Sequence, residues 1–218
     1  MKKVISAENI GLVLNEIKTA VKPFEVPAVS HFNRSPFHVL FSCILSLRTK
    51  DRVTIEASRR LFEAADSCRK LIELDAKELE KLIYPVGFYK TKAKRIKEIA
   101  EILEKKGCKV PDSMERLLEL PGVGRKTANL VIAEGFGRPA ICVDTHVHRI
   151  SNRIGLIKSK GPFESEMELM KVLPKRCWIE YNKLLVAFGQ NICLPVSPFC
   201  SRCPIKGLCP RISVKKSR

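Results

Sequence analysis

The sequence has no long run of apolar residues, although 45% of its 218 residues are hydrophobic. A transmembrane helix needs about 20 consecutive, mostly apolar residues, so we expect no membrane span. The chain starts with Met1-Lys2-Lys3, but Glu8 and Asn9 interrupt it before the apolar stretch of a secretory signal can form. We therefore expect a cytoplasmic protein.

Acidic residues are scarce, because 23 Asp and Glu stand against 40 Lys and Arg, which gives a formal net charge of +17. The imbalance is greatest at the C-terminal end, where no acidic residue follows Glu180. Such an excess usually indicates a polyanionic partner, most often nucleic acid, with a merely basic surface as the alternative. The basic residues beyond Glu180 are Lys183, Arg202, Lys206, Arg211, Lys215, Lys216 and Arg218.

The alternating pattern of β-strands is also missing, apart from a short stretch at 139–143. Apolar residues instead recur at helical spacing through most of the chain, and no repeat of fixed period or low-complexity segment interrupts them. We predict an all-α protein with short connections. Its expected helices span residues 7–21, 37–47, 52–65, 75–83, 91–106, 113–120, 125–134, 144–154, 164–172 and 178–190.

The nine cysteines divide into two classes. Five are scattered among apolar or helical neighbours, and we interpret them as ordinary packed or half-exposed residues. Disulfides are not expected between them in an intracellular protein. These five are Cys43, Cys68, Cys108, Cys142 and Cys177.

The other four cysteines lie close together near the C-terminal end, with the spacing C-x6-C-x2-C-x5-C. Four thiolates on a short proline-containing loop can bind a metal ion or an iron–sulfur cluster. Only one pair has the C-x2-C spacing of a zinc knuckle, so an iron–sulfur cluster fits better, while zinc stays open. No flavin or nicotinamide fingerprint accompanies the loop, which favours a structural cluster that orders Arg202 and Lys206 for phosphate contact. The four candidates are Cys193, Cys200, Cys203 and Cys209.

Residues 120–128 read LPGVGRKTA and predict two helices joined by a sharp turn. Gly122 and Gly124 let the backbone reverse, while Val123 fills the gap between the helices. The second helix begins at Arg125, and its first amides are bare. The helix dipole favours an anion there. We interpret the hairpin as a grip on a DNA backbone without sequence preference, against the alternative of a hairpin that binds nothing.

Lys126 and Asp144 are the candidate catalytic residues. Most lysines are merely solvated, but an amine in the first turn of a helix beside Arg125 would have its charged form disfavoured, which frees it for nucleophilic attack. Asp144 opens the segment VDTH, where it can cap a helix and can also serve as a carboxylate beside a reacting sugar. His146 follows it as a candidate phosphate contact.

In this order and at these separations, the LPGVGRKTA, VDTH and cysteine motifs resemble the endonuclease III family, the bifunctional DNA glycosylases and AP lyases of base-excision repair. The resemblance runs from about Phe37 to Cys209. It implies two helical domains with a DNA cleft between them. A six-helix barrel carrying the helix–hairpin–helix would span residues 28–138, and residues 1–27 plus 139–218 would carry a 4Fe–4S cluster loop.

The resemblance also implies residue roles. Lys126 matches the Schiff-base lysine, Asp144 the catalytic aspartate, and the four clustered cysteines the ligands of the 4Fe–4S cluster. The stretch GFYKTKA at 87–93 resembles a loop that inserts an apolar wedge into the duplex, which makes Phe88 the wedge candidate and a core aromatic the alternative. The family often has a glutamine where this chain has Arg48, so we expect the Arg48 guanidinium to fill the gap left by an extruded base.

We therefore predict removal of oxidised pyrimidines from double-stranded DNA and cleavage 3′ to the abasic site by β-elimination, by a monomer acting at the nucleoid. The predicted DNA contacts are Gly122, Val123, Gly124, Arg125, Arg48, Phe88, His146, Arg202 and Lys206. One alternative is a monofunctional glycosylase for mispaired adenine, thymine or uracil, although such relatives typically replace the lysine. The other is a cluster-bearing module that binds DNA without catalysis.

Overall fold

The computed structural model describes residues 5–24, 27–32 and 35–218. Within these ranges the chain forms helices joined by short loops, without a β-strand, which confirms the all-α prediction. None of the helices in the described ranges is both long and apolar enough to cross a membrane.

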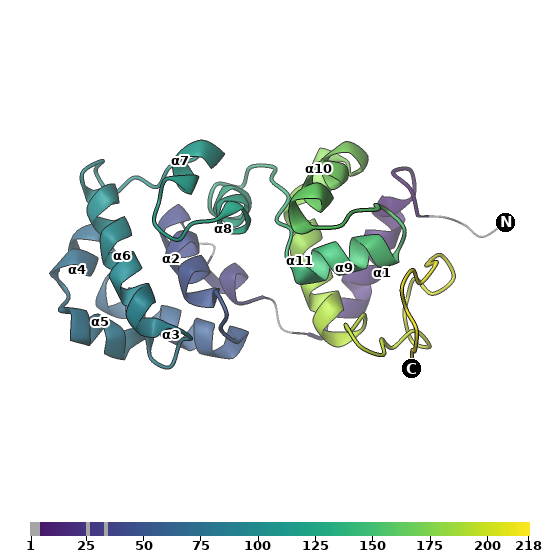
Figure 1. Cartoon of the computed structure of the whole chain (residues 1–218), viewed down its shortest axis with the longest axis horizontal. Helices are drawn as coiled ribbons and strands as arrows, with labels where there is room; N and C mark the ends of the chain where they lie inside the picture. Colours follow the sequence, from purple (N-terminus) through teal and green to yellow (C-terminus); the bar gives the residue numbers. More distant parts are fainter. Residues whose placement is uncertain (1–4, 25–26, 33–34) are drawn as a thin grey trace. The chain divides into compact units, whose positions relative to one another are not determined.

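The contacts between residues divide the chain into two compact units (Figure 1). The central unit is Pro27–Arg138, and the terminal unit combines Met1–Val26 with Pro139–Arg218. Each unit has a hydrophobic core of its own.

The central unit is built around α2 (Pro36–Ser46), whose flanking helices include α3, α6 and α8. Ser35 caps α2 by accepting a hydrogen bond from the amide of His38, and Pro36 occupies the first turn, where its missing N–H costs nothing. Buried side chains cover most of the α2 surface, so this helix forms the middle of the core. The other elements are η1 (Ala28–Phe32), α3 (Asp51–Ala64), α4 (Cys68–Glu73), α5 (Ala76–Ile83), α6 (Tyr89–Glu104), α7 (Met114–Leu118), α8 (Arg125–Leu130) and η2 (Val131–Gly135).

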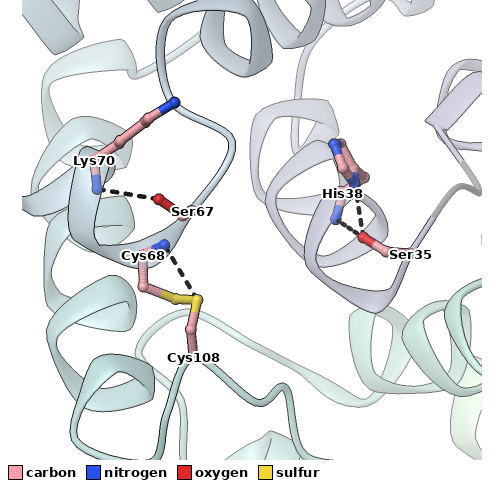
Figure 2. Close-up of a disulfide and its surroundings, with 6 residues drawn as sticks. All are labelled: Ser35, His38, Ser67, Cys68, Lys70 and Cys108. Atoms are coloured by element: carbon pink, nitrogen blue, oxygen red, sulfur yellow. Dashed lines mark hydrogen bonds between the residues drawn. A yellow bond between two sulfur atoms is a disulfide. The ribbon is translucent and has the colours of Figure 1, made fainter.

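Cys68 and Cys108 form a disulfide, so the expectation that these cysteines are unpaired is wrong (Figure 2). Their Cα atoms lie 5.7 Å apart, although 40 residues separate them in the sequence. The bond joins the first residue of α4 to the loop that follows α6, and the amide of Cys68 also donates to the sulfur of Cys108. The packing of α4 against α6 brings the two together, which their positions in the sequence did not reveal.

The terminal unit packs α11 (Trp178–Asn191) against α1 (Ile10–Val21) and α9 (Thr145–Arg153). The fully buried Tyr181 of α11 shares a 2.8 Å hydrogen bond with Ser151 of α9, which satisfies both hydroxyls inside the core. The remaining elements are α10 (Pro162–Val172) and the 3₁₀ turn η3 (Lys175–Cys177). The cysteine loop follows α11 and runs close to the C-terminal end of α9.

The 3₁₀ turn η1 of the central unit was not predicted, and two further elements of this unit were missed as well. The short helix α4 has only six residues, too few for a clear apolar period. The other is the π-helical turn η2, which continues α8 and ends at Gly135. A Cβ at Gly135 would lie 2.8 Å from the Cα of Pro36, so this glycine allows the turn to approach α2 closely.

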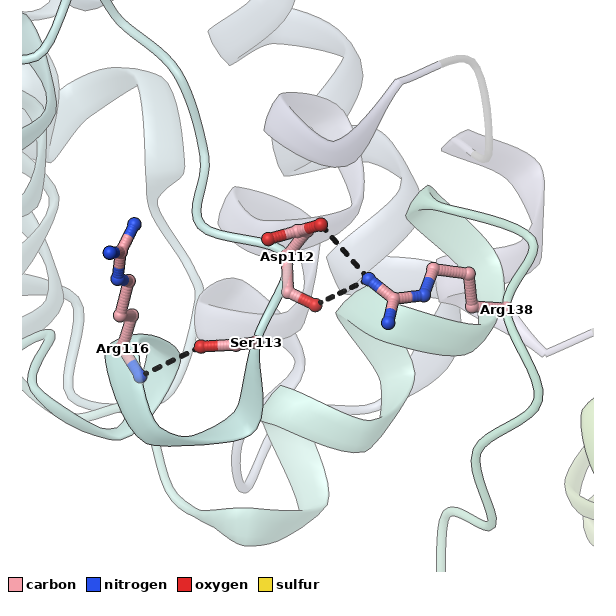
Figure 3. Close-up of polar contacts among 4 residues, drawn as sticks. All are labelled: Asp112, Ser113, Arg116 and Arg138. Carbon is pink, nitrogen blue, oxygen red and sulfur yellow. Dashed lines mark hydrogen bonds and ion pairs between the residues drawn. The ribbon is translucent and has the colours of Figure 1, made fainter.

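An ion pair braces the two ends of the segment that contains the hairpin (Figure 3). The guanidinium of Arg138, just beyond η2, donates to the carboxylate of Asp112 at 2.9 Å and to its backbone carbonyl at 3.0 Å. Ser113 then caps α7 by accepting a hydrogen bond from the amide of Arg116. The entrance to α7 and the exit from η2 are thereby tied together.

Candidate functional site

The predicted hairpin lies between α7 and α8. Gly122 has a φ of +75°, which favours glycine, and a Cβ there would lie 2.8 Å from Cδ of Arg95, whose side chain would have to move. Val123 is buried between the helices, as its predicted packing role requires. Gly124 is the N-cap of α8 and has open space where a Cβ would be, which leaves the first amides of α8 accessible.

Lys126 is an exposed residue in the first turn of α8, next to the half-buried Arg125. Thr127, Ala128 and Asn129, which follow, are buried and fix the helix against the core of the central unit. The charge of Lys126 also has an electrostatic effect on a buried thiol in this core, that of Cys43. Burial raises the pKa of Cys43 to about 12, while the charge of Lys126 lowers it and that of Glu134 raises it. Lys126 is thus an exposed residue on a helix that is held against the core.

Asp144 is the N-cap of α9 in the terminal unit. Its Oδ1 atom accepts hydrogen bonds from the amides of His146 and Val147, each at 2.8 Å. The other carboxylate oxygen, Oδ2, takes no part in this cap. Capping therefore fixes the orientation of the carboxyl group while leaving one oxygen for other chemistry.

His146 packs between α9 and α11. A Cβ at Gly189 of α11 would lie 2.4 Å from Nδ1 of His146, so the absence of a side chain at Gly189 makes room for the ring. Arg149 donates to the carbonyl of Gly189 at 3.3 Å and lies 3.2 Å from the His146 ring nitrogen. These contacts give His146 a packing role within the terminal unit, and its contact with DNA stays a prediction.

Two arginines of α9 hold the start of the cysteine loop. Arg153 is buried and donates to the carbonyls of Leu194 at 2.6 Å and Pro195 at 2.7 Å. Arg149 donates to the carbonyl of Cys193 at 2.9 Å. The helix that begins with the Asp144 cap therefore ends in a polar anchor for the loop.

The four clustered cysteines are all partly buried and line one cavity together with Phe188, Phe199 and Ile205. Burial raises the pKa of Cys203 to about 11 and also raises the pKa of Cys209, and the neighbouring cysteines act in the same direction. Thiolates in this position need a compensating positive charge, which a bound metal supplies. The donor set therefore fits the iron–sulfur cluster that the spacing favours.

Arg202 and Lys206 lie exposed in the same loop. The Arg202 guanidinium stacks on one ring, that of Phe199, at 3.9 Å from the centroid, and Arg218 lies 4.1 Å from the same centroid. The Lys206 ammonium donates to the carbonyl of Ser201 at 3.3 Å. Both predicted phosphate contacts are thus held by the cysteine loop itself.

Arg48 and Phe88 lie next to each other in the central unit, although 40 positions separate them in the sequence. The Arg48 guanidinium is 5.8 Å from the centroid of the Phe88 ring, within range of a cation–π interaction. Phe88 is 64% exposed, so it is not a core aromatic. Both residues have a positive φ, of 52° and 59°.

The sequence places Lys92 in a basic patch with Lys90 and Lys94 that would neutralise phosphate, and for Lys92 this expectation is wrong because the residue is buried. Its role inside the central unit is a functional feature that the sequence reasoning missed. Its side chain is 3% exposed, and its ammonium contacts the loop that carries Arg48. The sequence did contain a signal for this burial, because Lys92 lies one turn before Ile96 on the apolar face of a helix. A lysine on such a face needs buried hydrogen-bond partners.

A family model described as HhH-GPD superfamily base excision DNA repair protein matches residues 41–175 of this chain. The endonuclease III of Thermotoga maritima is 49% identical over 181 residues, which cover 83% of this chain and 85% of the relative. The endonuclease III-like protein 1 of Mus musculus is 45% identical over 178 residues, which cover 80% of this chain and 59% of that longer protein.

Among solved structures, a trapped endonuclease III–DNA covalent intermediate, described as an estranged-adenine complex, matches with a TM-score of 0.82. It is 35% identical in sequence, and the match covers 95% of this chain and 97% of the solved one. The likeness thus includes both compact units.

Proposed function

The chain belongs to the HhH-GPD superfamily of base excision DNA repair proteins, among its endonuclease III members, and on this basis we propose that it is a bifunctional DNA glycosylase and AP lyase. It removes oxidised pyrimidines from double-stranded DNA and cuts the strand 3′ to the resulting abasic site. Acting on chromosomal DNA, it works in the cytoplasm at the nucleoid, as a monomer.

The observation that carries this proposal is the position of Lys126. A covalent protein–DNA intermediate needs a nucleophile on the protein. Such an intermediate has been trapped with an endonuclease III whose structure aligns with 95% of this chain. Lys126 offers an exposed primary amine directly after the hairpin, in the first turn of α8. The monofunctional alternative has no use for an amine in this position.

The reaction follows from an amine beside a deoxyribose. The lone pair of Lys126 forms a bond to C1′, and the base leaves with the electrons of the glycosidic bond and takes up a proton. Opening of the sugar ring converts the C1′ adduct into a Schiff base. Loss of a proton from C2′ then expels the 3′ phosphate with the electrons of the C3′–O bond. Asp144, held by its cap, stabilises positive charge at C1′ and assists the proton transfers.

The groups that bind the duplex do so without reading the base sequence. The first amides of α8 are open to a phosphate because Gly124 has no side chain, and the α8 dipole favours the anion. Arg48 and Phe88 enter the duplex where the damaged nucleotide has left the stack. Extruding a nucleotide costs a few kcal/mol and costs least for a damaged base, which supports selectivity.

Cys193, Cys200, Cys203 and Cys209 would hold a 4Fe–4S cluster, whose contribution is structural. With the cluster bound, the loop presents Arg202 and Lys206 to the DNA backbone. We assign the barrel domain to residues 28–138 and the cluster-bearing domain to residues 1–27 with 139–218. The division of contacts into two compact units supports these boundaries.

Borohydride trapping tests the proposal, because the reductant converts a Schiff base into a stable covalent adduct. We expect wild-type protein to form an adduct with a duplex that contains an oxidised pyrimidine and with one that contains an abasic site. Lys126→Ala should form none, whereas Lys77→Ala, which removes an exposed lysine of α5, should react as wild type does.

The products formed on the same duplexes distinguish this proposal from a monofunctional glycosylase and from a module that only binds DNA. A monofunctional enzyme would release a base without cutting the strand, and a binding module would shift the duplex in a gel without releasing any base. An adduct that persists in Lys126→Ala would refute the assigned nucleophile. An absorbance shoulder in the blue would distinguish iron–sulfur from zinc.

A further inference from the structure

Arg48 and Phe88 are exposed side chains that come from two different loops. Arg48 lies in the loop between α2 and α3, and Phe88 directly precedes α6. Each has a left-handed backbone conformation, with φ values of 52° and 59°, which a non-glycine residue keeps only where its surroundings impose it. Something in the central unit must therefore hold both loops.

The ammonium of Lys92 holds the first of these loops. It donates to the carbonyls of Leu45 at 2.8 Å and Leu47 at 2.5 Å, and to the hydroxyl of Thr49 at 3.1 Å. An ammonium has three donors, and all three are used on the segment that flanks Arg48. The carbonyls of Leu45 and Leu47 belong to the C-terminal end of α2, where the helix dipole also favours a positive charge.

Lys92 also belongs to the element that carries Phe88. It lies in the first turn of α6, where its amide donates to the carbonyl of Phe88 at 3.0 Å. The Thr49 hydroxyl closes the connection, because it accepts from Lys92 and from the amide of Gly87 at 3.2 Å, and donates to the carbonyl of Leu47. Every polar group in this network has a partner.

The two loops also touch directly at Gly87. A Cβ on this residue would lie 2.7 Å from the carbonyl oxygen of Arg48, so the backbones meet more closely than any other residue permits. The contact and the hydrogen-bond network act together on the pair of exposed side chains. Their separation is thereby fixed before any duplex arrives.

We propose that Lys92 is a positioning residue that locks the Arg48 and Phe88 loops into one preformed probe of the DNA duplex. The inference rests on the proposed function and identifies how that function obtains a rigid probe. A probe that is ordered in the free protein avoids the entropic cost of ordering two loops during binding. It also keeps the guanidinium and the ring at one separation while a nucleotide leaves the stack.

The chemistry of Lys92 suits this role. Burial, followed by the charge of Arg95, lowers the pKa of Lys92 to about 8, so the amine is predominantly protonated at neutral pH and can use all three donors. Its buried position also prevents it from contacting phosphate. An effect of Lys92 on DNA must therefore act through the loops that it holds.

Lys92→Met tests the proposal, because it keeps the length and apolar body of the side chain and removes the three donors. The matched control is Lys94→Met, which removes the same charge from an exposed side chain of α6. One probe is a duplex with 2-aminopurine opposite a tetrahydrofuran abasic analogue, whose fluorescence reports entry of the probe residues. The other is a single-stranded abasic oligonucleotide, on which borohydride trapping needs no gap to be filled.

For Lys92→Met we expect unchanged trapping on the single strand and a reduced fluorescence rise on the duplex. Nicking of a duplex with an oxidised pyrimidine should fall by about 10- to 100-fold, as expected when probe residues are displaced by about 1 Å. The salt dependence of duplex binding should stay that of wild type. Lys94→Met should show a normal fluorescence rise.

A coupling measurement distinguishes positioning from general destabilisation. In an Arg48→Ala/Phe88→Ala background, Lys92→Met should cause no further loss of duplex nicking, because the side chains that it positions are gone. If Lys92→Met does not fold, Thr49→Val replaces it as the decisive variant, since this change removes only the bridging hydroxyl.

A normal fluorescence rise in the folded variant, or losses that add fully in the double background, would overturn the proposal. Failure of wild-type protein to trap on the single strand would instead overturn the lyase function. The fluorescence experiment would still report on the probe, so the two failures are distinguishable.

Discussion

At the scale of single residues, the two hairpin glycines have different tasks. Gly122 has a positive φ and lies against the side chain of Arg95, so it is needed for the hairpin to form. Gly124 has a φ of −98° and open space in front of its Cα, so any residue could adopt its conformation. Its missing side chain serves only the approach of a phosphate to the amides of α8.

Substituting each glycine by alanine should separate these tasks. We expect Gly122→Ala to lower the free energy of unfolding by about 1–2 kcal/mol, because the left-handed conformation is strained for alanine. Gly124→Ala should leave that free energy unchanged within about 0.5 kcal/mol and weaken duplex binding. Urea unfolding and a binding titration measure the two effects, and a stability loss in Gly124→Ala equal to that in Gly122→Ala would contradict the assignment.

Residue chemistry that depends on near neighbours could be predicted from the sequence. The Asp144 cap, the buried Val123 and the turn at Gly122 all follow from residues within a few positions. The contact of Arg48 with Phe88 could not, because it joins loops that only the packing of α2 and α6 brings together. Lys92 was missed for the same reason, since its partners are carbonyl groups more than 40 positions away.

At the scale of elements, α9 connects two parts of the candidate site. Its first amides orient Asp144, and its last turn places Arg153 against the carbonyls of Leu194 and Pro195. A buried guanidinium that lost these acceptors would be costly, so the start of the cysteine loop and the end of the helix are firmly linked. Ordering of the loop is thereby coupled to the helix that carries the carboxylate.

The ends of the long helices were predicted to within a few residues, because an apolar period and a stop signal define them. Trp178–Asn191, for example, was expected at 178–190. The π-helical turn at Val131–Gly135 could not be predicted, since its apolar residues are equally compatible with a continued α-helix. The close approach of Gly135 to Pro36, a contact between distant segments, accompanies this turn.

The bond between α4 and the loop after α6 leads to a prediction about stability. A disulfide that closes a loop of 40 residues restricts the unfolded chain and is expected to stabilise the fold by about 2–4 kcal/mol. Cys68→Ala/Cys108→Ala should therefore unfold at a lower temperature than oxidised wild type. Cys177→Ala, which truncates a buried cysteine that forms no disulfide, measures the cost of truncation.

Calorimetry under oxidising conditions checks this expectation, and the wild-type protein with its disulfide reduced should resemble the double variant. Equal melting temperatures for oxidised wild type and the double variant would mean that the bond does not contribute to stability. Duplex nicking should stay at the wild-type level, because the disulfide contacts none of the residues assigned to catalysis or DNA binding.

At the scale of the whole molecule, charge is distributed unevenly along the chain. The net charge is +17, and the last 38 residues, 181–218, contain seven basic residues and no acidic one. In the structure, two of these basic residues, Arg202 and Lys206, are exposed in the loop that the cysteines form. The proposed cluster and the charge surplus therefore share one segment, so we expect loss of the cluster to weaken DNA binding.

The class of fold and the type of partner could be predicted at this scale because composition and helical period are properties of the whole sequence. The order of contacts within each unit could not, because it depends on which apolar faces meet. The terminal unit illustrates this, since α1 and α11 pack together although more than 150 residues separate them. Nothing in either helix alone identifies the other as its neighbour.

The share of Arg202 and Lys206 in DNA affinity can be measured by salt titration. The logarithm of the binding constant falls linearly with that of the salt concentration, with a slope of about −0.9 for each phosphate neutralised. Arg202→Ala/Lys206→Ala should therefore reduce the steepness of this slope by about 2, whereas Lys105→Ala/Lys106→Ala, which removes two exposed charges of the central unit, should leave it nearly unchanged.

The comparison is made on a duplex with an abasic analogue, and the iron content of each variant shows whether the cysteine loop has stayed intact. The loop variant should keep the iron content of wild type, because the Arg202 and Lys206 side chains are exposed and are not themselves ligands. If both double variants reduced the slope equally, DNA would be attracted by the net charge alone. Arg202 and Lys206 would then have no specific place in the interface, and the cysteine loop would need another role.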